Sequence, residues 1–305
     1  MYLRLLKSEL FRASKLKSTY ILIIVLLAIS MIMNLVVLKF DFMGAYGMDS
    51  EQFLELAEGG NTMEGVNDAA QFGSLMGGNL ATSDPEDVKL LGEGLFYSAD
   101  IPTLFQLHVS DLNPIMLIAI FVGIFAGDIV NTGVNKNLVI SNNKRNVLFA
   151  ARATVIAIYS VIIHVFTWLY TVLGALIWAK KVDLGWSQHA VVYWFVSLLL
   201  TIVFAILIYA ITVLTKSKAA GITIGVVLST GALSLIISIA DWAIKKKLDV
   251  KSDFSVANYL LTENLGSLRV DYTNTALIRA LVVAAFYTVV GIVVVAVINK
   301  KRDLA

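Results

Sequence analysis

Long apolar runs, separated by polar and charged stretches, dominate the pattern of this chain. A helix that crosses a membrane needs about 20 mostly apolar residues, because the hydrocarbon core is about 30 Å thick and each residue adds about 1.5 Å. The pattern therefore predicts six transmembrane helices, over residues 20–38, 114–130, 153–179, 190–214, 219–244 and 276–298. The fold class that follows is an all-α polytopic membrane protein.

The composition excludes several other classes of protein. Of the 305 residues, 58% are hydrophobic, well above the roughly 45–50% of a soluble domain, and the mean hydropathy is +0.80. The chain has no cysteine, which excludes disulfide frameworks and thiolate metal sites. The 24 basic and 22 acidic residues nearly balance, and the resulting net charge of +2 does not indicate a nucleic-acid partner.

Lysine and arginine are distributed unevenly among the segments between the predicted spans. Residues 1–19, 131–152, 215–218 and 299–305 carry 14 of them, and the alternate segments carry 9. Basic residues favour the cytoplasmic side, so we expect both termini, including the tail over 299–305, in the cytoplasm of a cell membrane, most simply a bacterial one. The segment over 245–275 is then external, although it contains four lysines and one arginine.

The segment over 39–113 is expected outside the cell and is strongly acidic. It holds 13 aspartates and glutamates and two lysines. It is too long for a simple linker, and we expect helices over 51–58 and from Ser83, where a capping serine precedes Asp84-Pro85. Its charge suits a basic ligand, but a solvated acidic surface explains it equally well.

Residues 1–19 predict an amphipathic helix in the membrane interface. Leu3, Leu6 and Leu10 recur at helical spacing. Polar and charged residues surround them, among which we single out Arg4, Lys7, Glu9 and Arg12. Such a helix attracts anionic lipid and sets the topology; a further role is that of an elbow that transmits motion to the bundle.

Motifs for enzyme chemistry are missing from the sequence. It contains no G-x-x-x-x-G-K-[ST], no H-E-x-x-H and no G-x-S-x-G, so we expect no catalytic, metal or cofactor site in this chain. The ionisable residues in or at the edge of the spans are few: Asp128, His164, Asp241 and Arg279. An ion-driven carrier needs a chain of such groups across the membrane, which argues against that class.

Two pairs of glycines predict close helix packing. Gly123 and Gly127 lie four residues apart in the second span, and Gly221 and Gly225 do so in the fifth. Small residues at this spacing let two helix backbones approach closely, either within one chain or between two chains.

The order of these parts resembles the permease subunit of a type-two ABC exporter, in the group of bacitracin-resistance and lantibiotic-immunity permeases. The resemblance rests on the basic start Leu6-Lys7-Ser8-Glu9-Leu10-Phe11-Arg12, the large external segment, six spans and the ending Asn299-Lys300-Lys301-Arg302. The stretch after the second span is also similar to the family pattern of acid, Gly-Thr, Leu, Ser or Gly, Arg and Lys or Arg. Its matching residues are Asp128, Thr132, Gly133, Asn137, Leu138, Ser141, Arg145 and Arg152, and the coupling set that the resemblance implies also includes Asn131 and Lys144.

The resemblance implies a role for residues 131–152. In this family the corresponding stretch is a coupling segment that inserts into a separate ATPase. The expected partners are an ABC ATP-binding subunit in two copies, which would hold ATP and Mg, a second permease chain, identical or homologous, and membrane lipid. The expected function is export or extraction of an amphiphile, an antimicrobial peptide or a lipid. The alternative is a membrane sensor or assembly scaffold with an acidic ligand-binding ectodomain.

Overall fold

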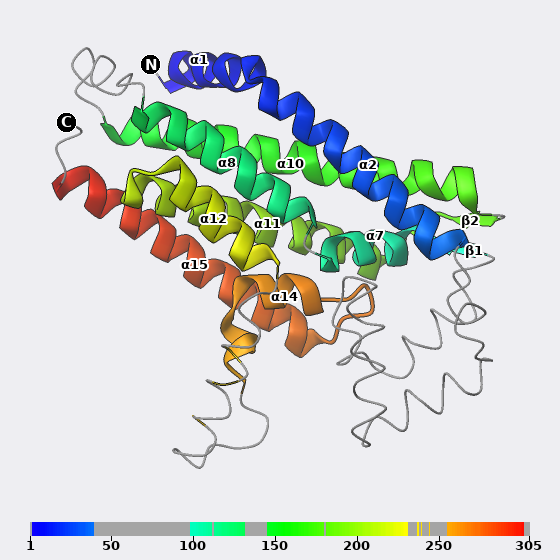
Figure 1. The fold of residues 1–305 in the computed structure, drawn as a ribbon. Helices are drawn as coiled ribbons and strands as arrows, with labels where there is room; N and C mark the ends of the chain where they lie inside the picture. Colours follow the sequence, from blue (N-terminus) through cyan, green and yellow to red (C-terminus); the bar gives the residue numbers. More distant parts are fainter. Residues whose placement is uncertain are drawn as a thin grey trace. The chain divides into compact units, whose positions relative to one another are not determined.

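A computed structural model of the chain describes residues 2–39, 98–111, 113–131, 145–179, 181–230 and 255–301, with single positions at 237, 239 and 244. These residues are mostly helical (Figure 1). The helices are α1 (Tyr2–Lys15), α2 (Lys17–Lys39), α7 (Ile101–Ser110), α8 (Asn113–Asn131), α10 (Arg145–Trp178), α11 (Gln188–Thr215), α12 (Lys218–Ser229), α14 (Leu261–Ser267) and α15 (Asn274–Lys301), and a 3-10 turn covers Val256–Tyr259.

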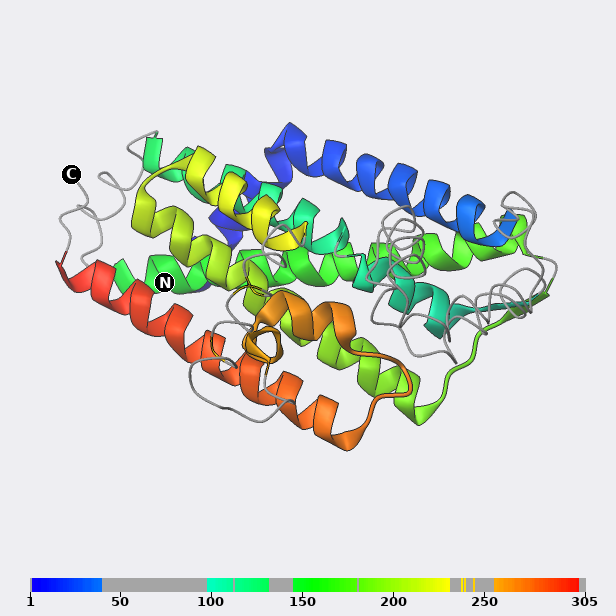
Figure 2. The same ribbon diagram turned by 60° about the horizontal axis from the view of Figure 1, so that its bottom comes forward.

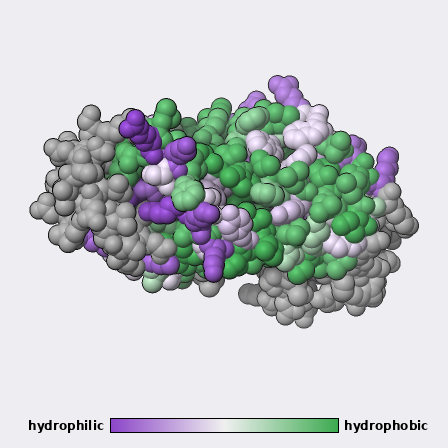
Figure 3. All heavy atoms as spheres, turned by 90° about the horizontal axis from the view of Figure 1, so that it is seen from above, coloured by the Kyte–Doolittle hydropathy of each residue, from purple (hydrophilic) through white to green (hydrophobic). Residues whose placement is uncertain are grey.

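Four of the described helices are long and apolar enough to cross a membrane. Their qualifying stretches are Lys17–Val36, Val147–Trp178, Gln188–Thr215 and Asn274–Val294, and a fifth span results if the bent pair Ile101–Ser110 and Asn113–Gly127 is counted as one. Large apolar side chains face outward on these helices, as Leu176 and Phe195 do, at 63% and 60% exposed. Figure 3 shows such side chains covering much of one face, with hydrophilic ones gathered over α1. The chain is therefore an α-helical membrane protein.

One predicted boundary needs correction. The helix α10 begins at Arg145, so residues 145–152 belong to the same helix as the predicted third span and not to a separate segment. Within the predicted span over 219–244, α12 ends at Ser229, and residues 231–236 lie outside the described part of the chain.

The described residues also contain two short strands, a departure from an all-α fold. β1 (Ser98–Asp100) pairs in parallel with β2 (Lys181–Asp183). The Asp100 side chain then caps α7 by accepting from the backbone N–H of Thr103 at 3.0 Å. The predicted helices over 51–58 and from Ser83 lie outside the described residues.

The chain forms two compact units. The first contains residues 1–26, 112–166 and 188–305. In it α8 packs against α11 and α12, and α11 packs against α15 (Figure 1), while α14 lies beside the start of α15 (Figure 2). Its core includes the ring of Phe121, which lies 5.7 Å from Phe125 and 4.5 Å from Tyr159 between centroids.

The second unit contains residues 27–111 and 167–187. Its core consists of Leu38, Ile101, Leu104 and Ala175, with Trp168 and Trp178 packed against them. The buried side chain of Asn34 crosses from α2 to α10, because its amide donates to the carbonyls of Ser30 at 2.9 Å and Tyr170 at 3.3 Å. A polar bridge of this kind holds apolar helices together in lipid, where the alternative is an unpaired amide.

Candidate functional site: the charged contact of α1 with α8 and α10

The predicted coupling residues surround a gap in the described chain. The backbones of Asp128 and Asn131 form the last turn of α8, and Arg145 begins α10. The remaining members of the set, Thr132, Gly133, Asn137, Leu138, Ser141 and Lys144, lie outside the described residues. Of the whole set, Arg152 alone has a described side chain, and this side chain lies in a charged cluster with α1.

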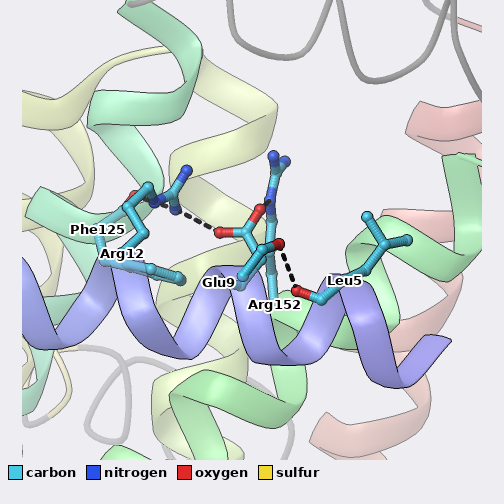
Figure 4. Close-up of polar contacts among 6 residues, drawn as sticks. Leu5, Glu9, Arg12, Phe125 and Arg152 are labelled. Carbon is cyan, nitrogen blue, oxygen red and sulfur yellow. Dashed lines mark hydrogen bonds and ion pairs between the residues drawn. The ribbon is translucent and has the colours of Figure 1, made fainter. Parts of the chain in front are cut away.

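Glu9 and Arg152 form a buried ion pair between α1 and α10. The Nε of Arg152 donates to Oε1 of Glu9 at 3.1 Å, and the two side chains are only 2% and 4% exposed (Figure 4). Removing one partner of a buried ion pair leaves the other charge buried without compensation, which typically costs about 3–5 kcal/mol. This pair therefore holds α1 firmly at the position where α10 completes its second turn.

Arg12 adds a second cation to the same carboxylate. Its Nη2 lies 2.9 Å from Oε2 of Glu9, and the two residues are one helical turn apart on α1. The guanidinium carbon also lies 4.5 Å from the ring centroid of Phe125, and Nη2 is 3.5 Å from the carbonyl oxygen of that residue. Arg12 thus connects α1 to α8, six residues before the end of α8 at which the predicted coupling segment begins.

A third connection lies at the start of α1. The Tyr2 hydroxyl lies 2.7 Å from the Thr154 hydroxyl, and because Thr154 donates to the carbonyl of Ala150, Tyr2 is the donor. Tyr2 and Glu9 are seven residues apart and share one face of α1. This face is held against α10 along two turns, and the described contacts leave α1 little freedom to move separately.

The α1 cluster, by which we mean Glu9, Arg12, Arg152 and Tyr209, joins polar groups from three helices. Two guanidinium groups flank one carboxylate, and the buried Tyr209 hydroxyl from α11 lies in the electrostatic field of all three. The cluster reaches the surface at Arg12, which is 30% exposed.

The remaining surface of α1 divides into two sides. Glu9 and Ala13 are its buried residues, whereas Arg4 and Lys7 are exposed. Leu3 and Phe11 are also exposed, at 74% and 63%. A helix with one face against the protein and both leucine and basic side chains outside has the surface that an interfacial helix requires.

The four predicted packing glycines all lie in contacts within one chain. Gly123 and Gly127 of α8 face Ile222 and Lys218 of α12. In return Gly225 of α12 faces Ala119, while Gly221 faces Thr212 of α11. An added Cβ at Gly127 would lie 2.7 Å from the Lys218 Cα, so only glycine allows the two backbones this approach.

Two other ionisable residues named from the sequence, His164 and Arg279, have their described contacts outside the α1 cluster. His164 is buried in α10, and its Nε2 lies 3.3 Å from the Trp194 carbonyl and 3.4 Å from the Ser197 hydroxyl. Arg279 of α15 donates hydrogen bonds to the side chains of Asn264 and Asn258. The side chains of Asp128 and Asp241 lie outside the described residues.

Sequence reasoning named Glu9, Arg12 and Arg152 without pairing them, and it missed Phe125 and Tyr209. One signal was available: Glu9 is the first acidic residue of the chain, and the next is Asp41. A lone carboxylate in a basic helix, between apolar positions, indicates a buried cationic partner. The identity of that partner depends on the tertiary structure.

The residues that the structure brings together join the predicted interfacial helix to the two helices that border residues 132–144. No protein-family model and no curated protein matches this chain.

Proposed function

We propose that the chain is the membrane-spanning permease subunit of an ABC exporter, which moves or extracts an amphiphilic substrate, an antimicrobial peptide or a lipid. The energy comes from ATP that a separate subunit hydrolyses. The observation that carries the proposal is the buried Glu9–Arg152 pair, because it joins α1 to the helix that follows the predicted coupling segment. The resemblance of most of the chain to the type-two exporter pattern supplies the partner.

The contacts support mechanical coupling. A partner that displaces residues 132–144 would move the end of α8 and the start of α10. Since Arg12 contacts α8 and Glu9 contacts α10, α1 would follow both helices. The glycine contacts between α8 and α12 carry the same displacement into the bundle. Interfaces this closely packed shift as units and do not deform gradually.

Replacing residues 134–143 by a Gly-Ser linker of equal length should abolish binding of the partner ATPase. The linker removes the residues that would enter the ATPase and keeps the chain length. The measurement is co-purification with an ABC ATPase, which the proposal expects a neighbouring gene to encode, together with the ATPase rate of the reconstituted complex. The control replaces residues 61–70 by the same linker and should leave both unchanged. Undiminished ATPase binding by the 134–143 variant would contradict the coupling role.

A neighbouring histidine kinase in place of an ABC ATPase, with no ATPase that co-purifies, would favour the sensor or scaffold alternative. In that case the acidic segment over 39–113 would be the working part of the protein, and the α1 cluster would serve stability alone.

The proposed topology has a direct test, because the chain lacks cysteine and any introduced thiol is unique. We expect Glu64→Cys to react with a membrane-impermeant maleimide on intact cells. Ser141→Cys, in the predicted coupling segment, should react only after the cells are permeabilised. Protection of position 64 in intact cells, with labelling only after lysis, would place the acidic segment inside and reject the proposed orientation.

A further inference from the structure

We propose that Arg279 and the exposed apolar row that follows it on α15 bind one acidic phospholipid, with the guanidinium on the phosphate and the row along an acyl chain. The row consists of Val282, Phe286, Val289 and Val293, and we call it the α15 row. The proposal does not depend on the function proposed above, because it rests on the 3-10 turn Val256–Tyr259, α14 and α15 alone.

Two asparagines orient the Arg279 guanidinium. Its Nη1 donates to Oδ1 of Asn258 at 2.6 Å, and its Nε donates to Oδ1 of Asn264 at 3.3 Å. The Asn264 amide nitrogen donates to the carbonyls of Asn258 and Leu260, both at 2.8 Å, which directs its oxygen toward Arg279. A guanidinium has five N–H donors, so these two bonds hold the group and leave donors at Nη2 for another acceptor.

The positive charge of Arg279 is not neutralised within the described part of the chain. Both acceptors are neutral amides, and no described carboxylate lies within ion-pair distance of the guanidinium. A fixed cation with neutral partners at the edge of a membrane favours a phosphate.

The α15 row continues directly from Arg279. The steps from 279 to 282, 286, 289 and 293 are three, four, three and four residues, so the five positions form one row along the helix. The four apolar members are 62%, 62%, 60% and 52% exposed in chain order. The buried face of α15, with Ala280, Val283 and Ala284, lies beside this row and packs toward the rest of the unit. Figure 2 shows the start of α15 next to α14.

The length of the row suits one lipid tail. Fourteen residues separate Arg279 from Val293, which corresponds to about 21 Å along the helix at about 1.5 Å per residue. One leaflet of the hydrocarbon core is about 15 Å deep. A phosphate at Arg279 thus places its acyl chain against the row throughout the leaflet. A free phosphate would use the cation and leave the row without a role.

The test measures lipid retention by the full chain in detergent, with native mass spectrometry. The probes are phosphatidylglycerol and phosphatidylcholine with identical acyl chains. We expect the wild-type chain to retain phosphatidylglycerol preferentially. Asn258→Asp keeps the shape and the acceptor of the side chain but adds a carboxylate beside Arg279, and it should weaken phosphatidylglycerol retention roughly tenfold. Arg279→Gln should have the same effect, and Lys181→Gln, an exposed lysine of β2, should have none.

Unchanged phosphatidylglycerol retention in Asn258→Asp, or equal retention of the two lipids by the wild-type chain, would overturn the proposal. If soluble glycerol phosphate displaces phosphatidylglycerol at a similar concentration, the site recognises the phosphate group alone, and the assignment of a lipid is wrong. Tryptophan fluorescence during heating shows whether each variant is folded, and Asn258→Asp should unfold no earlier than the wild type, because it adds an ion pair.

Discussion

Replacing Glu9 by alanine is expected to lower the free energy of unfolding by about 3–5 kcal/mol. The substitution leaves the Arg152 guanidinium buried, at 2% exposure, without its carboxylate. Arg152→Met should also destabilise the protein, since it leaves Glu9 with Arg12 as its one remaining cationic neighbour among the described residues. Unfolding of the detergent-solubilised chain is followed by tryptophan fluorescence, which suits a protein with five tryptophans and no thiol.

The double variant Glu9→Leu with Arg152→Met is the matched comparison. Replacing both members of a buried pair by apolar residues of similar size is often neutral or stabilising, so the double variant should recover most of the loss. Lys7→Gln, which changes an exposed residue of the same helix, should change stability by less than about 0.5 kcal/mol. A loss below about 1 kcal/mol for Glu9→Ala would mean that the pair is solvated in the working protein.

The same variants separate stability from coupling. If the α1 cluster transmits displacement as proposed, the double variant should be folded and bind the partner ATPase, yet show weakened stimulation of ATP hydrolysis by substrate. Normal stimulation in the folded double variant would leave the cluster with a structural role only.

Replacing Gly225 by alanine is expected to destabilise the first unit by about 1–3 kcal/mol. The added Cβ would lie 2.6 Å from the Cβ of Ala119. Neither atom moves by side-chain rotation, because a Cβ is fixed to its backbone. The helices α8 and α12 must therefore separate, and the loss of packing exceeds the roughly 1 kcal/mol that alanine gains over glycine in a helix.

Two comparisons isolate the steric cause. The double variant Gly225→Ala with Ala119→Gly transfers the methyl group from one helix to the other and should restore most of the stability. Gly291→Ala places its Cβ 3.4 Å from Ile206, an ordinary contact, and should be neutral or stabilising. If Gly225→Ala and Gly291→Ala have equal thermal stability, the close approach of α8 and α12 is not a feature of the protein in its membrane.

Apolar length alone predicts the position of the long helices. The predicted spans over 20–38, 153–179, 190–214 and 276–298 coincide with helices long and apolar enough to cross a membrane, because a run of that length has few alternatives to a helix in lipid. The end of α12 at Ser229, inside the predicted span over 219–244, has no counterpart in the hydropathy pattern. The strand pair β1 and β2 was equally hidden, because three residues carry no periodic signal.

The sequence predicted the charged residues of the candidate site but not how they pair. Its charged members Glu9, Arg12 and Arg152 stand out in the sequence because charges are costly among apolar residues. Glu9 and Arg152 are 143 residues apart in the sequence, so no local sequence pattern predicts that they form a pair.

By itself, the amino-acid sequence determined that this is an α-helical membrane protein, because apolar length and the cost of unpaired backbone groups in lipid are properties of each segment alone. It also determined which few charged residues need an explanation. Only the tertiary structure decided that Glu9 meets Arg152, that the glycines of α8 and α12 meet within one chain, and that two asparagines hold Arg279. These contacts depend on how helices distant in sequence pack, which is decided by the shapes and charges of both partners together.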